Sequence, residues 1–394
     1  MEKKLRIGID VDNGDLVDGI PPTQKILRAV SRVLKENDNV HFVLSGNEQR
    51  IMESFRKVPN SVSIIPSDVY CPPEQKIKKP VEGSSLNNLV KKTKEKGEEN
   101  IGGFFTIGDT RKVGIEGARL GRHSRVEKPC LVTPIPSFPS GRFFLGDVGA
   151  TSLNQNVDIL ADIENPETFD QFHLNNRKPY LIAIDEFSRE LYCNGIMLAV
   201  FSQQNGLKMP RLGIVTVGGE NHKGSDIILR TDYLFKQQQG KLENFIEYIG
   251  KIEPKDALLE DRVDIAVSDG HTGNLMLKLS EAIVNLIKGV YQDTKNKLNK
   301  IEKALCLPTG LILKKDMRRI RETYDPDYYN AAILIGYSGI IGKGHGNSNE
   351  DAVYYGIRRI TDCVSQGISP KLDEALESYM PKPSRYTIPR YKSD

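Results

Sequence analysis

The stretch that decides the fold is RVDIAVSDGHTGNLMLK, residues 262–278. Its apolar β-branched residues Val263, Ile265 and Val267 predict a buried strand that ends at Asp269, and a helical apolar pattern begins at Leu275. A strand, a tight turn and a helix start form the arrangement in which α/β proteins bind anions. The candidate binding residues of this turn are Asp269, Gly270, His271, Thr272, Gly273 and Asn274, with Lys278 one turn further on.

The same alternation of strands and helices extends over most of the chain. Strands are expected at residues 5–10, 40–44, 62–65, 103–107, 129–134, 142–146, 211–217, 263–267 and 331–335, and helices at 23–35 and 48–57. Such alternation indicates an α/β fold with a mostly parallel sheet covered on both faces. We expect one α/β domain over residues 1–370, with an irregular surface insertion at 154–189 and an extended tail at 380–394.

Composition narrows the class of protein. The chain has 394 residues and a formal net charge of +3, which does not indicate a nucleic-acid binder. We expect no leader peptide, and no apolar run approaches the roughly 20 residues that span a bilayer. Five scattered cysteines without a CxxC pair indicate reduced thiols and no metal cluster. The sequence therefore suggests a cytoplasmic enzyme.

Four more glycine-rich loops follow expected strands, and each carries polar side chains. Backbone N–H groups in such turns bind anions, although each glycine also has the simpler reading that its turn needs a positive φ. Lys223, Lys343 and His345 could supply charge or protons, and Asn347 or Ser348 could cap the following helix. The candidate residues of these loops are Asp10, Gly14, Asp15, Thr106, Asp109, Thr110, Gly218, Glu220, Lys223, Gly224, His345, Gly346 and Ser348.

Residues 280–321 predict a pair of helices joined by an apolar tip at 304–313 with lysines and arginines on both sides. An apolar tip with a basic collar suits an anionic membrane surface. The alternative is that the tip packs on the body of the protein or on a second subunit. Both readings stay open at this level.

Missing motifs exclude several chemistries. The chain has no Walker A pattern, no HExxH zinc motif and no GxSxG nucleophile elbow. The glycines at 342, 344 and 346 match a dinucleotide-binding fingerprint only weakly, because no acidic residue that could bind the ribose follows them.

Taken in order, the motifs resemble the PlsX family of acyl-carrier-protein:phosphate acyltransferases over residues 5–368. The matching residues are Asp10, Gly14 and Asp15; Lys78, Lys79, Ser84 and Ser85; Asp147, Gly149 and Ala150; Gly218, Glu220, Lys223 and Gly224; Asp269 to Lys278; and Ile335, Gly336, His345, Gly346 and Ser348. The resemblance implies a three-layer α/β/α fold similar to isocitrate dehydrogenases, a homodimer, and a helical pair that associates with the membrane. Asp12, Asp109 to Arg111 and the residues after Ala150 depart from the family pattern, which indicates a divergent member. Arg111 could pair with Asp109 or bind phosphate directly.

The resemblance implies attack of inorganic phosphate on an acyl thioester, which gives an acyl-phosphate for phospholipid synthesis and needs no cofactor or metal. Lys223, Asn274 and His345 are then the catalytic candidates, and Arg111, Asp147 and Gly149 join the substrate-binding set. Asp10 and Asp15 more readily orient loops, because a carboxylate repels phosphate. Acidic acyl-carrier protein would meet a basic patch, either Lys76, Lys78, Lys79, Lys91 and Lys92 or residues 314–321. The alternatives are a coenzyme A-dependent phosphate acyltransferase and a non-catalytic relative that binds acyl-carrier protein or membrane.

Overall fold

The computed structural model describes residues 4–17, 19–55, 57–72, 75, 77–149, 166–220, 223–297 and 331–381, with the backbone alone for 166–182. Its centre is an 11-stranded sheet in the order β3-β2-β1-β4-β11-β10-β5-β6-β9-β7-β8. The strands are β1 (Leu5–Asp10), β2 (Val40–Gly46), β3 (Val62–Pro66), β4 (Gly103–Thr106), β5 (Cys130–Ser137), β6 (Gly141–Gly146), β7 (Arg211–Val215), β8 (Glu247–Ile252), β9 (Ile265–Val267), β10 (Ala332–Ile335) and β11 (Ile340–Lys343).

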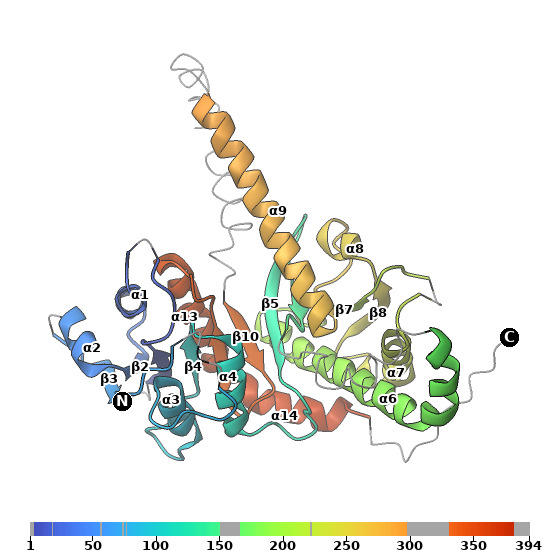
Figure 1. Cartoon of the computed structure of the whole chain (residues 1–394), viewed down its shortest axis with the longest axis horizontal. Helices are drawn as coiled ribbons and strands as arrows, with labels where there is room; N and C mark the ends of the chain where they lie inside the picture. The colour runs from blue at the N-terminus through green and yellow to red at the C-terminus, as the bar shows by residue number, and fades with distance from the viewer. Residues whose placement is uncertain are drawn as a thin grey trace.

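Helices lie on both faces of this sheet (Figure 1). They are α1 (Pro22–Glu36), α2 (Glu48–Ser54), α3 (Ser85–Lys94), α4 (Thr110–Gly117), the 3-10 turn η1 (Ala118–Leu120), α6 (Pro166–Gln204), α7 (Asp226–Leu242), α8 (Pro254–Leu258), α9 (Gly270–Lys297), α13 (Glu350–Ser365) and α14 (Ile368–Tyr379). One core cluster joins the sheet to α1, α6, α7, α13 and α14, and a second joins it to α3, α4 and α8. The predicted α/β class with a mostly parallel sheet covered on both faces is confirmed.

Strand β1 shows how sequence sets the two faces. Ile7 and Ile9 alternate with Gly8, and both isoleucines are fully buried in the first cluster. A Cβ on Gly8 would lie 2.8 Å from Leu89 of α3, so the missing side chain lets α3 pack closely on the other face. Glycine therefore sets the spacing between the sheet and α3.

Strand direction divides the sheet into two halves. Strands β3, β2, β1, β4 and β11 are parallel to one another, and so are β6, β9, β7 and β8. Between them, β11-β10, β10-β5 and β5-β6 are antiparallel pairs. Three reversals make the second half run opposite to the first. The two sets of carboxyl-terminal loops therefore follow opposite ends of the sheet.

Three expectations need correction. The insertion is not irregular throughout, because residues 166–189 belong to the long helix α6, while 154–165 lie outside the described residues. The loop expected after residue 335 contains strand β11, and β8 was not expected at all. The cap of α13 is Asn349, whose side chain accepts a hydrogen bond from the Ala352 backbone, instead of Asn347 or Ser348.

Helix α9 projects away from the body (Figure 1). It supplies the first part of the predicted helical pair, while the remainder, including the tip at 304–313, lies outside the described residues. Helix α14 ends at Tyr379, past the expected boundary at 370, and tail residues 382–394 are also outside the description. Within the described ranges, no helix is both long and apolar enough to cross a bilayer.

Candidate functional site

Asp10, at the end of β1, is completely buried. Its carboxylate accepts hydrogen bonds from Thr106 Oγ1 at 2.6 Å and Ser85 Oγ at 2.7 Å, and from the Asn13 side chain. Burial raises the pKa of Asp10, although these hydrogen bonds oppose the rise. Asp10 and Thr106, two candidate substrate-binding residues, therefore hold the loops of the first half together and offer no accessible surface to a ligand.

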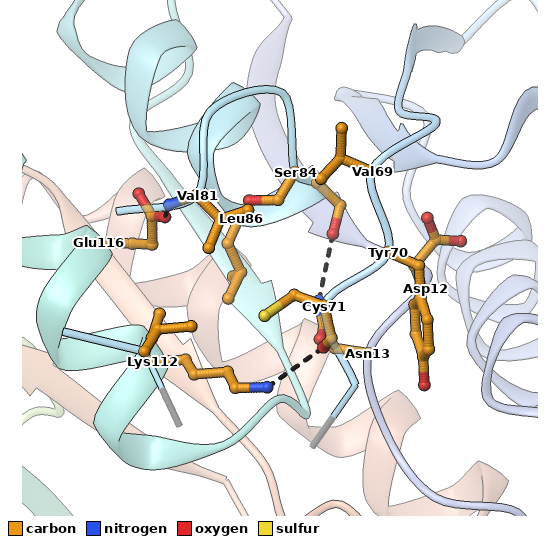
Figure 2. A pocket seen from close by; sticks show the side chains of 12 residues that line it. Asp12, Asn13, Val69, Tyr70, Cys71, Val81, Ser84, Leu86, Lys112 and Glu116 are labelled. Carbon is orange, nitrogen blue, oxygen red and sulfur yellow. Dashed lines mark hydrogen bonds between the residues drawn. The ribbon is translucent and has the colours of Figure 1, made fainter. Parts of the chain in front are cut away.

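The neighbouring pocket is filled by its own side chains (Figure 2). Asp12 accepts hydrogen bonds from the Asn47 backbone at 3.1 and 3.0 Å, and burial raises its pKa to about 6. Lys112 is buried and donates to the carbonyl oxygens of Cys71 and Pro72. The remaining cavity is about 10 Å³, whereas a single water needs roughly 10–15 Å³. This cluster is structural, and a substrate does not fit inside it.

Helix α4 is capped at its N-terminus by the side chain of Asp109. The Asp109 carboxylate accepts hydrogen bonds from the backbone N–H groups of Arg111 and Lys112, both at 3.1 Å. The Arg111 side chain is exposed and makes no ion pair with Asp109, so of the two roles considered for Arg111 the pairing is not observed. Arg111 is thus available to an anion, and Thr110 beside it is also exposed.

Cationic side chains from the two halves meet beside β11. His345 Nε2 lies 3.5 Å from Glu281 Oε1 of α9, and Lys278 Nζ lies 2.9 Å from Glu281 Oε2. Burial lowers the pKa of Lys343 to about 8; Asp109 and Asp15 oppose this, and the charge of Lys278 adds to it. Burial pushes the pKa of Glu281 upward, but hydrogen bonds from His345 and Lys278 bring it below its ordinary value.

The turn at Gly346 directly follows His345 and contacts the loop that carries Asp15. The Asp15 backbone N–H donates to the Gly346 carbonyl at 2.9 Å, and a Cβ on Gly346 would lie 2.6 Å from Asp15 Oδ2. Gly14 has φ 124°, and a Cβ there would lie 2.4 Å from Ile107. Ser348 is buried, and its Oγ has no hydrogen-bond partner among the described residues.

In the second half, the turn quoted at the outset starts helix α9. Asp269 accepts hydrogen bonds from the backbone N–H groups of His271 and Thr272 and, at 2.6 Å, from Thr272 Oγ1. A Cβ on Gly273 would lie 1.8 Å from the Asp147 carbonyl oxygen, so only glycine fits there. The close approach brings Asn274 within contact distance of Gly149. The structure therefore brings Asp147, Gly149 and the Asp269 turn together.

The loop after β7 carries Lys223. Lys251 Nζ donates to the carbonyl oxygens of Glu220, at 2.5 Å, and Lys223, at 2.7 Å, and so fixes the loop backbone. The Lys223 side chain is exposed and lies against Gly218. Gly224 adopts φ 112° beside Thr216, whose buried Oγ1 has no partner among the described residues.

The site is a meeting of two halves across α9, instead of the single sheet edge that the motifs predicted. Lys223 and Asn274 follow strands of the second half, and His345 follows a strand of the first. Four strand steps separate β11 from β9, and a twist of roughly 20–25° per step rotates one strand by about 80–100° relative to the other. The contact between His345 and Glu281 brings the halves together. No contact places the Lys223 side chain in this group.

Sequence reasoning missed Glu281, which contacts both His345 and Lys278. It carries no motif signal, because it lies among apolar residues of a helical stretch. Lys343 was a candidate for charge but not for the catalytic set. The part of the chain that the structure describes contains no cluster of three or more histidine, cysteine or acidic side chains able to hold a metal.

Comparison with known proteins gives consistent results. The sequence model of a family described as "Fatty acid synthesis protein" matches residues 182–371. A protein named phosphate acyltransferase from Bacillus subtilis (strain 168) is 25% identical over 377 residues, covering 95% of this chain and 98% of the relative. Another of the same name, from Neorickettsia sennetsu, is 27% identical, covering 95% and 97%. A phosphotransacetylase structure from Streptococcus pyogenes aligns at TM-score 0.49 with 12% identity, covering 96% of each chain.

Fold and site define an α/β protein in which cationic side chains from the two halves of one sheet meet at α9. The predicted resemblance to the PlsX family is confirmed, because curated proteins named phosphate acyltransferase align with 95% of the chain at 25–27% identity.

Proposed function

We propose that this protein is an acyltransferase that moves an acyl group from acyl-carrier protein to inorganic phosphate, producing acyl-phosphate for phospholipid synthesis. The similarity to curated phosphate acyltransferases supports the reaction. The observation that carries the proposal at the level of the site is that Lys278 and His345, from the two halves, both contact Glu281 near Lys343. The charge of Lys278 disfavours the charge of Lys343, and an anion bound near both lysines relieves that repulsion.

The proposed phosphate site consists of Lys278 and Lys343, with Arg111 and the backbone at Gly346 nearby. Asp109 and Asp15 oppose the loss of the Lys343 proton, so they keep the lysine partly charged near neutral pH. The Asp109 carboxylate accepts backbone hydrogen bonds at the start of α4, and the Asp15 backbone N–H donates to the Gly346 carbonyl.

The chemistry is a direct exchange. A phosphate oxygen attacks the thioester carbon, the new C–O bond forms, the C–S bond breaks, and the sulfur leaves with the electron pair and takes a proton. Phosphate is itself a nucleophile, so the protein needs to supply position and charge stabilisation. In the proposed reaction His345, whose Nε2 lies 3.5 Å from Glu281 Oε1, delivers the proton. Asn274, beside Gly149, donates a hydrogen bond to the developing oxyanion.

The proposed partners are acyl-carrier protein, a membrane surface and a second copy of this chain. For the carrier, Lys78 and Lys79 are exposed, whereas Lys91 pairs with Glu82 and Lys92 pairs with Glu95, which weakens the expected patch. Lys76 and residues 314–321 lie outside the described residues. For the dimer and the membrane, α9 exposes an apolar stripe, with side chains 47–66% exposed, at Leu275, Leu279, Ile283, Leu286, Ile287 and Val290.

An activity assay tests the proposal. Purified protein is incubated with long-chain acyl-carrier protein and phosphate, and acyl-phosphate is trapped with hydroxylamine. Lys278→Ala should raise the KM for phosphate about tenfold or more, because a charge-assisted contact of roughly 1.5–3 kcal/mol is lost. Lys91→Ala, an exposed lysine paired with Glu82, is the matched control. If only coenzyme A thioesters give acyl-phosphate, the acyl donor is coenzyme A and not acyl-carrier protein. If the protein binds acyl-carrier protein but gives no product, it is a non-catalytic relative.

A further inference from the structure

A serine, a histidine and an aspartate from two distant parts of the chain are joined by hydrogen bonds in that order. His123 Nδ1 lies 2.8 Å from Asp373 Oδ1, and His123 Nε2 lies 3.1 Å from Ser369 Oγ. Ser369 and Asp373 are four residues apart on α14, so both lie on the same side of that helix. This order and these distances match the triad in which a histidine activates a serine for attack on a carbonyl group. The chain lacks a GxSxG motif, but the same triad occurs on unrelated folds and is defined by its geometry.

His123 is held in one orientation by its backbone and by Asp373. Its side chain is 3% exposed, its backbone N–H donates to the Gly336 carbonyl at 3.0 Å, and its carbonyl accepts from the Val126 N–H at 3.2 Å. An ionised carboxylate only accepts hydrogen bonds. The neutral histidine therefore donates from Nδ1 to Asp373 and leaves the Nε2 lone pair for the hydroxyl of Ser369. The arrangement presents His123 to Ser369 as a base.

The position of Ser369 suits a nucleophile. It lies in the first turn of α14, where the backbone N–H groups have no acceptor within the helix and carry a partial positive charge. Donors of this kind stabilise the oxyanion that forms when a serine attacks an acyl carbon. Ser369 is partly exposed and the Asp373 side chain is 53% exposed, so a small molecule can reach the hydroxyl from the solvent.

The three residues lie apart from the proposed phosphate site. Ser369 Oγ is also 3.5 Å from the carbonyl oxygen of Ser338, which precedes strand β11. His345 follows the same strand, so the two groups lie at opposite ends of β11. In Figure 1, α14 runs along the edge of the body opposite to the side from which α9 projects. An activity of these residues is therefore independent of acyl transfer to phosphate.

We propose that Ser369, His123 and Asp373 form a second catalytic site, which hydrolyses esters and thioesters with small acyl groups. The Ser369 oxygen attacks the carbonyl carbon and forms a C–O bond, while His123 takes the serine proton. His123 passes that proton to the alcohol or thiol that leaves as its bond to the acyl carbon breaks. Water, deprotonated by His123, then hydrolyses the acyl-serine to a carboxylic acid, and the serine recovers its proton. Asp373 is a positioning residue, because it acts through the His123 ring.

Hydrolysis of p-nitrophenyl acetate, with no phosphate or acyl-carrier protein in the assay, tests the proposal. Ser369→Ala should lower kcat/KM about hundredfold or more, because the nucleophile is lost. Ser378→Ala, an exposed serine at the other end of α14, is the matched control and should keep the wild-type value. Asp373→Asn should lower kcat about tenfold or more with KM unchanged, because asparagine favours the wrong histidine tautomer. Its control is the exposed neighbour Glu374→Gln.

A fluorophosphonate probe reports on the serine itself. An activated serine forms a P–O bond to the probe as fluoride leaves, and mass spectrometry identifies the labelled residue. The probe should label Ser369 and not Ser378, and Asp373→Asn should slow the labelling about tenfold or more. If Ser369 stays unlabelled, or if folded wild-type and Ser369→Ala proteins hydrolyse the ester equally fast, the second site is refuted. If Ser369 is labelled but the hydroxylamine assay finds no acyl-phosphate, the second site stands and the proposed acyl transfer fails.

Discussion

At the scale of single residues, Lys343 shows how burial tunes a charge for function. Burial lowers its pKa to about 8, two carboxylates oppose this shift, and Lys278 reinforces it. A lysine with such a pKa binds an anion well at neutral pH and loses its charge in mildly alkaline solution. An arginine at the same place would stay charged throughout.

The KM for phosphate should therefore rise with pH as Lys343 loses its proton near pH 8. In the unfolded chain this lysine titrates near 10.5, so between pH 8 and 10.5 the unfolded state binds more protons and the contribution of Lys343 to folding stability grows with pH. Phosphate affinity and this stability contribution should thus change in opposite directions. Steady-state kinetics from pH 7 to 9.5 check the expectation, and a wild-type profile as flat as that of Lys343→Arg would contradict it.

Asp12 is a second residue whose charge is disfavoured by burial. It is 7% exposed, and its pKa is raised to about 6. Between pH 3.8 and 6 the folded state binds more protons than the unfolded state, so the contribution of Asp12 to stability falls as pH rises through that window. At pH 7 the ionised carboxylate is destabilising, although the Asn47 backbone donates to it.

Asp12→Asn should raise the free energy of unfolding at pH 7 by up to about 3 kcal/mol and should change it little at pH 4. An asparagine oxygen can still accept a hydrogen bond from Asn47, so the loop should keep its conformation. Urea unfolding at both pH values measures the difference, with the exposed Asp38→Asn as control. Equal stabilisation at both pH values would show that ionisation of Asp12 is not the cause.

The sequence predicted which types of residue lie at the site better than it predicted what each residue does there. Gly273 allows the turn from Asp269 to Asn274 to approach the Asp147 backbone, because any Cβ at that position would collide with the Asp147 carbonyl oxygen. This approach also brings Asn274 next to Gly149. Asp10 was grouped with substrate-binding residues because it follows a strand. Its complete burial depends on Ser85, 75 positions away in the chain, and local patterns do not reveal such a partner.

At the scale of elements, helices were predicted where apolar periodicity is strong. Helix α1 matches its 3.6-residue pattern to within one residue at each end. Helix α6 was missed over its first half because residues 166–189 are rich in polar residues, and strand β11 was missed because its glycines resemble a loop. In both cases tertiary packing determines the secondary structure and local propensity does not.

The apolar stripe of α9 is an element-scale feature with a direct test. Leu286→Ser combined with Ile287→Ser should weaken self-association or liposome binding about tenfold or more. Burial of each of these two exposed side chains on association contributes roughly 1.5–3 kcal/mol of free energy. Analytical ultracentrifugation measures the first and liposome flotation the second. Asn285→Ser, an exposed neighbour on another face of α9, is the control. If neither assay responds, the stripe is not an association surface.

At the scale of the whole molecule, the three antiparallel pairs in the middle of the sheet determine the architecture. Alternating strands and helices predict parallel strands within each half. They do not show that the second half reverses direction, because that depends on which strands become neighbours. The reversal puts the carboxyl-terminal loops of the two halves at opposite ends of the sheet, and α9 connects the halves, because it begins at Gly270 after β9 and its Glu281 contacts His345 after β11.

Phosphate bound at Lys278 and Lys343 should therefore protect both halves of the molecule at once. In hydrogen–deuterium exchange, saturating phosphate should slow exchange in residues 343–348 of the first half and in 269–281 of the second, because the anion contacts Lys343 and Lys278 together. Lys278→Ala should lose the protection in both segments, whereas Lys91→Ala should keep it. Protection confined to the loop that carries Lys223 would move the phosphate site to the end of β7. Lys278 and Lys343 would then not hold the phosphate for acyl transfer.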